Sequence, residues 1–260
     1  MDNKEGWRLI EDRPRDACAN MAIDEAIFIA FEKGLVPKTI RLYGWNPPAI
    51  SVGCFQKISK LFDQKRLEEI SLDLVRRPTG GRAVFHEEEL TYSIVSGLDT
   101  FSESSIVESY RIISHALIKG LKNLGISAEI SPRKKRGSGM VSASCFSSPS
   151  LYEVLVQGKK VIGSAQKRSK KGLLQQGSIL LNLDRERWTT IFNSADNTMI
   201  SLQEILNRKI SSQEVSEALI MAISESIGAL FHGELTPFEK KISERLKKEK
   251  YSTKEWNFQR

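Results

Sequence analysis

Residues 73–96, DLVRRPTGGRAVFHEEELTYSIVS, carry the pattern that decides the fold class of this 260-residue chain. Apolar and β-branched residues on both sides of a glycine pair predict a strand, a glycine-rich turn and two further strands. Because glycine has no Cβ, the backbone at such a turn can approach a ligand closely. The glycine spacing matches neither the dinucleotide-binding fingerprint nor the Walker loop, so a plain hairpin turn is the competing interpretation.

The sequence on either side adds both strands and helices, which predicts an α+β fold. We expect strands at 7–12, 39–45, 49–55, 151–165 and 173–183, and helices between the first two strands, at 60–70, at 104–124 and through most of the last third. In that last third, one helix face is predicted to carry Val215, Leu219, Ala222, Ile223, Ile227 and Leu230. No repeat or linker divides the chain, so we expect a single domain over residues 1–260.

A polar stretch at 131–150, SPRKKRGSGMVSASCFSSPS, shows neither helical nor strand periodicity. We interpret it as a long loop, and long loops inside compact domains are usually functional.

The charge balance favours an anionic partner. Lys and Arg number 39 against 32 Asp and Glu, a formal net charge of +7, and such an excess attracts anions at long range. The basic residues form short clusters, at 133–136 and 167–171, without regularly interleaved aromatic residues. A base-stacking surface for nucleic acid is therefore not favoured, whereas a small acidic protein fits.

Several classes of protein are not supported by the sequence. The N-terminal residues lack the apolar stretch of a secretory signal, and no window approaches the length of a membrane span, so we expect a cytoplasmic protein without membrane contact. Three cysteines and three histidines are scattered along the chain. This spacing fits neither a disulfide framework nor a metal site, and we expect no metal.

Cys145 is the cysteine best placed for chemistry, because it lies among small polar residues of the long loop. Cys18 and Cys54 lie instead in apolar helix and strand patterns, where a cysteine behaves as an inert packing residue. A thiol nucleophile needs a nearby cation or base to hold it as thiolate. Lys159 and Lys160 are candidates, and alternation along a strand sends their side chains to opposite faces. The competing interpretation is that both are solvated.

Five segments, in this order, resemble the lipoate-protein ligase and octanoyltransferase family: ANMAIDEA (19–26), RRPTGGRAVFH (76–86), CFSSPSLYE (145–153), GKKVIGSAQ (158–166) and LLQQGSILL (173–181). The resemblance spans nearly the whole chain. It implies a catalytic domain of the biotin/lipoate-ligase type, with a mixed β-sheet, flanking helices and an acyl pocket between the TGG segment and the GKK strand.

The same resemblance assigns roles to individual residues. The family's nucleophile falls on Cys145 and its essential lysine on Lys160. The substrate-binding residues that it implies are Arg77, Gly80, Gly81, His86, Gly163 and Ala165. By its position alone, His86 fits a hydrogen-bonded structural residue as well as a catalytic base.

Two departures from the ligase pattern point to the LipM type of octanoyltransferase. ATP-dependent ligases of the family typically have a third glycine where this chain has Arg82, and they lack the cysteine element that is complete here from Cys145 to Glu153. A third difference is Gln176, which stands where the family usually has histidine. A role that depends on an imidazole cannot be carried over to that position.

The mechanism that we expect has two halves. The Cys145 thiolate attacks the thioester of octanoyl-acyl carrier protein, and a lysine of a lipoyl-domain protein, such as glycine cleavage H protein, then attacks the acyl-cysteine, with Lys160 carrying the proton. A thioester is already activated, so neither ATP nor a metal is expected. The alternatives are an amidotransferase between lipoyl domains, an ATP-dependent lipoate ligase, and a basic nucleic-acid-binding protein.

Overall fold

Within the described residues of this computed structural model, 6–62, 69, 72–101, 105–131, 153–193 and 197–259, eight strands form one mixed sheet. These strands are β1 (Trp7–Glu11), β2 (Thr39–Tyr43), β6 (Glu89–Ser96), β7 (Glu129–Ile130), β8 (Val154–Val156), β9 (Lys159–Arg168), β10 (Leu173–Leu180) and β11 (Leu230–His232). Their order is β11-β1-β2-β6-β10-β9-β8-β7. β1 runs parallel to both of its neighbours, and the other pairs are antiparallel.

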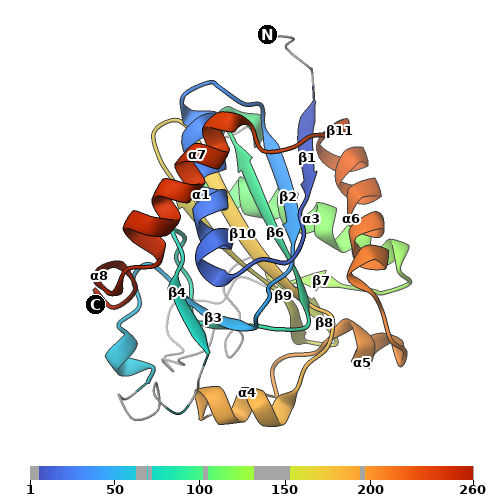
Figure 1. Cartoon of the computed structure of the whole chain (residues 1–260). Helices are drawn as coiled ribbons and strands as arrows, with labels where there is room; N and C mark the ends of the chain where they lie inside the picture. Colours follow the sequence, from blue (N-terminus) through green and yellow to red (C-terminus); the bar gives the residue numbers. More distant parts are fainter. Residues whose placement is uncertain are drawn as a thin grey trace.

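A smaller sheet lies below the large one in Figure 1 and has the order β4-β3-β5. It consists of β3 (Ala49–Val52), β4 (Asp73–Arg76) and β5 (Val84–His86). Its apolar side packs against α4 (Arg185–Phe192), where Ile50 and Phe85 share a buried cluster with Trp188. The two strands that flank the glycine pair, β4 and β5, therefore belong to this small sheet rather than to the large one.

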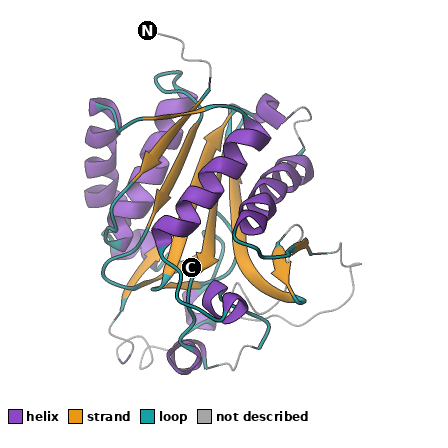
Figure 2. Ribbon diagram, turned by 90° about the vertical axis from the view of Figure 1, so that its right-hand side faces the viewer, coloured by secondary structure: helices purple, strands orange, loops and turns teal. Residues whose placement is uncertain are grey.

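Helices cover both faces of the large sheet (Figures 1 and 2). α1 (Ala17–Glu32) and α7 (Pro237–Leu246) lie on one face, and α3 (Ile106–Asn123) and α6 (Ser212–Ile227) lie on the other. Shorter segments are η1 (Ile58–Lys60), η2 (Leu98–Phe101), α5 (Leu202–Leu206), η3 (Lys247–Tyr251) and α8 (Lys254–Asn257).

Each long helix begins at a residue whose side chain accepts a backbone N–H of the first turn. The capping residues are Asp16, Ser105, Ser211 and Thr236. Such caps satisfy N–H groups that have no partner inside the helix, which explains why the helices begin at these positions.

The structure confirms the α+β class with a mixed sheet and flanking helices, and most of the predicted elements. The strand predicted at 49–55 ends at Val52, and two further assignments are wrong. The run 151–165 contains two strands, because Gln157 and Gly158 adopt positive φ and form the turn of a hairpin between β8 and β9. Leu230 does not continue the helix of Val215: α6 ends at Ile227, Gly228 has φ +116°, and Leu230 pairs with Trp7 in the sheet.

Two other predictions cannot be compared with the structure. Most of the expected helix at 60–70 and the expected loop at 131–150 lie outside the described residues. Among the residues that are described, no helix is long and apolar enough to cross a membrane. The same residues contain no group of three or more His, Cys, Asp or Glu side chains that could hold a metal ion.

Candidate active site

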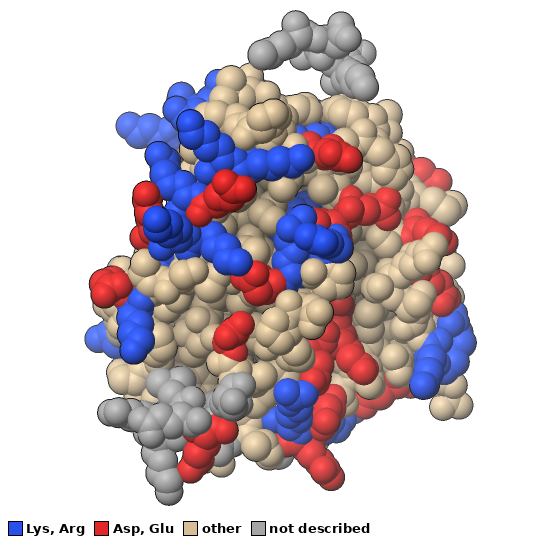
Figure 3. All heavy atoms as spheres, in the orientation of Figure 1, with Lys and Arg blue, Asp and Glu red and all other residues tan. Residues whose placement is uncertain are grey.

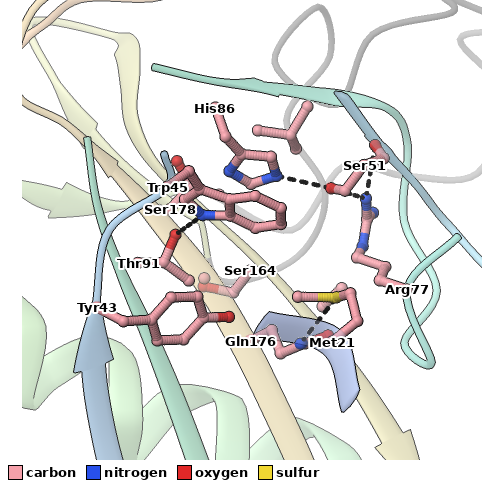
Figure 4. A pocket seen from close by; sticks show the side chains of 14 residues that line it. Met21, Tyr43, Trp45, Ser51, Arg77, His86, Thr91, Ser164, Gln176 and Ser178 are labelled. Carbon is pink, nitrogen blue, oxygen red and sulfur yellow. Dashed lines mark hydrogen bonds between the residues drawn. The ribbon is translucent and has the colours of Figure 1, made fainter. Parts of the chain in front are cut away.

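A cavity lies where the small sheet meets the large one (Figure 4). Its walls come from α1, β2, β3, β5, β6, β9 and β10 and from the segments next to them. The lining residues are Met21, Tyr43, Trp45, Ser51, Arg77, Val84, His86, Thr91, Gly163, Ser164, Ala165, Gln176, Gly177 and Ser178. Gly163 and Ala165 on β9 place little side chain in the cavity, whereas the space beside Gly177 on β10 is filled by the ring of Tyr92.

Arg77 connects this cavity to the glycine pair. Its guanidinium is buried and donates hydrogen bonds to the carbonyl oxygens of Gly80 (2.7 Å) and Arg82 (2.7 Å) and to the Oγ of Ser51 (3.0 Å). Arg77 lines the cavity, whereas Gly80 and Gly81 belong to the loop that Arg77 holds and are not among the lining residues.

Two glycines are required where this loop meets the turn that follows β3. A Cβ on Gly53, in that turn, would lie 2.1 Å from the carbonyl oxygen of Gly81, and Gly81 itself has φ +83°. Residues with a side chain rarely adopt that φ. Gly53 therefore lets the loop sit directly on the turn, and Gly81 allows the backbone conformation of the loop.

His86 lies in the cavity wall with both ring nitrogens engaged. Nε2 lies 2.7 Å from the Oγ of Ser51, and Nδ1 lies 2.8 Å from a carboxylate oxygen of Glu89. The indole of Trp45 stacks on the imidazole with 3.8 Å between ring centroids (Figure 4). These contacts hold the imidazole in one orientation in the cavity wall.

Gln176 joins two walls of the cavity. Its amide oxygen accepts a hydrogen bond from Thr79 (2.8 Å), and its amide nitrogen donates to the carboxylate of Asp24 (2.7 Å). A glutamine has both a donor and an acceptor available at any pH. At the position where the family usually has histidine, this chain thus has a residue that tethers the TGG loop to α1.

Asp24 was not predicted as a site residue, although it lies within ANMAIDEA. Besides Gln176, its carboxylate accepts hydrogen bonds from Arg41 (2.8 Å), Tyr43 (2.8 Å) and Ser93 (2.9 Å). Burial raises the pKa of Tyr43 well above its ordinary value, and the negative charge of Asp24 raises it further. Tyr43 therefore stays protonated and donates to Asp24. The sequence feature that could have identified Asp24 is a charged residue among the apolar positions of the predicted helix.

Lys160 is buried, with 2% of its side chain exposed, and forms an ion pair with Glu153. Lys159 is exposed, so the predicted alternation of the two lysines is confirmed. The backbone of Lys160 is held from the other side by bonds to Thr198 (2.7 Å) and Ile200 (3.0 Å). Lys160 is not among the residues that line the cavity, which β9 reaches at Gly163.

The predicted nucleophile, Cys145, lies outside the described residues, as does the basic cluster at 133–136. Of the other cysteines, Cys18 is half-buried in α1, where its Sγ lies 3.0 Å from the carbonyl oxygen of Tyr251. Burial raises the pKa of the Cys18 thiol, which disfavours the reactive thiolate. Cys54 is also half-buried, but β3 ends at Val52, so Cys54 lies in the following turn and not in a strand.

Comparison with known proteins identifies the relatives of the chain. The lipoyl protein ligase A/B catalytic domain matches residues 16–224. The chain is 42% identical to octanoyltransferase LipM of Kyrpidia tusciae, with 98% of this chain and 99% of the relative covered. It is 36% identical to octanoyltransferase LipM of Bacillus subtilis, with 99% of each covered.

Solved structures share the fold. Lipoate-protein ligase A bound with ATP superposes with a TM-score of 0.82 at 25% identity, over 96% of this chain and 98% of that one. A T. acidophilum protein assigned as a lipoate protein ligase, with bound lipoic acid, superposes with a TM-score of 0.81 at the same identity and coverage.

Proposed function

The chain belongs to the family of lipoyl protein ligase A/B catalytic domains, and from this membership we propose the route by which it transfers its acyl group. It is an octanoyltransferase, which implies an octanoyl donor and a lipoyl-domain acceptor. The proposed donor is octanoyl-acyl carrier protein. The proposed acceptor group is a lysine of a lipoyl-domain protein such as glycine cleavage H protein, and the proposed intermediate is an octanoyl thioester on Cys145.

The observation that carries this proposal is the buried ion pair of Lys160 and Glu153. Glu153 is the last residue of the segment CFSSPSLYE, which begins with Cys145. A buried ion pair seldom adds stability over an apolar pair of similar volume, so we attribute this pair to chemistry. It fastens the end of the cysteine segment to β9, the strand that forms part of the acyl cavity.

In the first half-reaction, the Cys145 thiolate attacks the carbonyl carbon of the donor thioester. The new carbon–sulfur bond forms as the bond to the carrier's sulfur breaks, and the departing thiolate takes a proton from the Lys160 ammonium. In the second half, the acceptor amine attacks the acyl-cysteine and loses a proton to Lys160. An amide forms and Cys145 is released as thiolate. Atoms and charges balance without ATP.

The cavity suits the acyl chain of this reaction. Val84, Ala165 and Met21 offer apolar surface, and Gly163 and Gly177 contribute no side chain to the wall. Burial of an alkyl chain contributes roughly 0.8 kcal/mol for each CH₂ group. The cavity can therefore hold the octanoyl chain firmly without a charged group to anchor it.

Intact-protein mass spectrometry tests this proposal. After incubation with octanoyl-acyl carrier protein in the absence of ATP, the wild-type enzyme should gain the mass of one octanoyl group. Cys145→Ser should give no thioester adduct and no transfer, because a serine hydroxyl is not activated in a site built for a thiolate. Cys18→Ser and Cys54→Ser are matched controls that should keep the adduct.

The same assay separates the alternatives. If octanoylated lipoyl domain forms the adduct faster than octanoyl-acyl carrier protein does, the enzyme is an amidotransferase. Transfer that requires octanoate and ATP would indicate a ligase. Full activity of Cys145→Ser would contradict the covalent route.

A further inference from the structure

Two exposed phenylalanines lie on segments that are distant in sequence and held together by one arginine. Phe55 is 73% exposed in the turn after β3, and Phe258 is 46% exposed just after α8. The fully buried guanidinium of Arg76 donates to the carbonyl oxygens of Gln56 (2.8 Å) and Asn257 (3.0 Å), the neighbours of these phenylalanines. Figure 1 shows the segment after β3 running beside α8.

Specific hydrogen bonds attach α8 to Arg76 at the end of β4. The side-chain oxygen of Asn257 accepts the backbone N–H of Arg76 (2.8 Å), and the indole of Trp256 donates to the Arg76 carbonyl (2.8 Å). Each contact joins residues about 180 positions apart in the chain. The two phenylalanines are therefore presented from a fixed backbone, which reduces the ordering cost when a partner binds them.

This surface is connected to the wall of the acyl cavity through two hydrogen bonds. A Cβ on Gly80 would lie 3.8 Å from the ring of Phe55, so the ring lies over Gly80. The Cys54 N–H donates to the carbonyl of Thr79 (2.9 Å), and Thr79 in turn donates to Gln176, which lines the cavity. A protein that binds over Phe55 thus contacts the loop next to the acyl chain.

Lysines lie on both segments that carry the two phenylalanines. Residues 53–60 and 250–259 contain Lys57, Lys60, Lys250 and Lys254 against a single acidic residue, Glu255. The ammonium of Lys250 lies 4.0 Å from the ring centroid of Trp256, which places it beside α8. Figure 3 shows further Lys and Arg side chains gathered along α7, the helix that precedes this segment. Aromatic anchors with a basic rim fit an acidic protein partner.

We propose that Phe55 and Phe258, with Lys57 and Lys254 on the same two segments, form the docking surface for the acyl carrier protein that delivers the octanoyl group. This inference rests on the proposed function. The donor is the partner that must both dock and pass an acyl chain into the cavity, so a surface joined to the cavity wall serves it. In the second half-reaction the chain is already on the enzyme, and only an amine has to reach it.

Comparing two octanoyl donors distinguishes a loss of docking from a change in the acyl cavity. The first is octanoyl-acyl carrier protein, and the second is octanoyl-N-acetylcysteamine, a small thioester without a protein. Phe55→Ser and Phe258→Ser should each raise the KM for the carrier protein by roughly 5- to 30-fold, as expected for loss of an aromatic anchor. The rate of acylation by the small thioester should stay at the wild-type value. Met221→Ser, on the exposed side of α6, is the matched control and should change neither.

The other outcomes each overturn the inference. An equal loss with both donors would mean that the phenylalanines shape the cavity, and no loss with either would remove them from recognition. A defect confined to transfer from pre-acylated enzyme to the lipoyl domain would assign the surface to the acceptor. If wild-type enzyme forms no acyl adduct with either donor, the proposed function fails instead.

Discussion

The two faces of the eight-stranded sheet are built from different kinds of residue. The face under α3 and α6 is a broad apolar cluster that includes Leu117, Leu219 and Ile162. The face under α1 also has apolar contacts, but it buries Asp24 and Arg41 and borders the acyl cavity. Burying charges is costly even when they are paired. The apolar face accounts for stability, and the α1 face accounts for the geometry of the cavity.

Removing one residue from each face should separate these contributions. Asp24→Ala leaves the buried Arg41 and the Gln176 amide without this partner and should lower the free energy of unfolding by about 3–5 kcal/mol. Leu117→Ala leaves a cavity in the apolar cluster and should lower it by about 2–5 kcal/mol. Denaturant unfolding measures both.

The two variants should differ in function despite similar stability. At a temperature where both are folded, Asp24→Ala should raise the KM for the octanoyl donor, because the tether of Gln176 is lost, while Leu117→Ala should leave it unchanged. Equal KM values would show that Asp24 contributes only to stability.

The difference between the faces could be predicted only in part. Periodicity found most strands and helices and placed Lys159 and Lys160 on opposite sides, because these features depend on neighbours in the chain. The partner of Lys160 was not predicted, since Glu153 meets it across a hairpin whose turn at Gln157 and Gly158 was read as strand. In the same way, sequence spacing gives no sign that Gln176 meets Asp24, which lies about 150 residues away.

For Leu230, local periodicity predicted a helix where the structure has a strand. Its spacing from Ile227 continues the helical pattern, but a glycine with positive φ ends the helix and the next residues pair with β1. A short edge strand of this kind depends on its neighbour in the sheet, which local sequence does not reveal.

The salt dependence of KM tests whether charged residues on the α1 and α7 side of the sheet attract the donor, and its expected effect is smaller. The basic cluster at 167–171 begins with Lys167, which pairs with Glu25 of α1, and Lys250 pairs with the same carboxylate. If this charged side attracts the donor, raising the salt from about 0.05 to 0.5 M should increase the KM for octanoyl-acyl carrier protein several-fold and change kcat less. A KM independent of salt would argue against electrostatic docking.

The smallest expected effect concerns Glu25 itself. Burial alone would raise the pKa of its carboxyl, but the hydrogen bond and charge of Lys250 and the charge of Lys167 hold the pKa below its ordinary value. A depressed pKa means that the stabilisation is present above the pKa of the unfolded chain and is lost as pH falls through the folded pKa. The stability gap between wild type and Glu25→Gln should therefore shrink below about pH 4. Thermal unfolding from neutral to acidic pH measures this gap, and a gap that widens on acidification would contradict the ion pairs.

Single-turnover acylation of lysine variants tests the central claim, that Cys145 and Lys160 act together, most directly. The measured quantity is the rate at which octanoyl-Cys145 forms from octanoyl-acyl carrier protein. Lys160→Ala should slow it by about 10²- to 10⁴-fold, the usual contribution of a proton-transferring group, and Lys159→Ala should leave it nearly unchanged. Lys160→Arg should not restore the rate, because a guanidinium holds its proton too tightly to pass it to the departing thiolate. Equal rates in Lys160→Ala and Lys159→Ala would contradict the account.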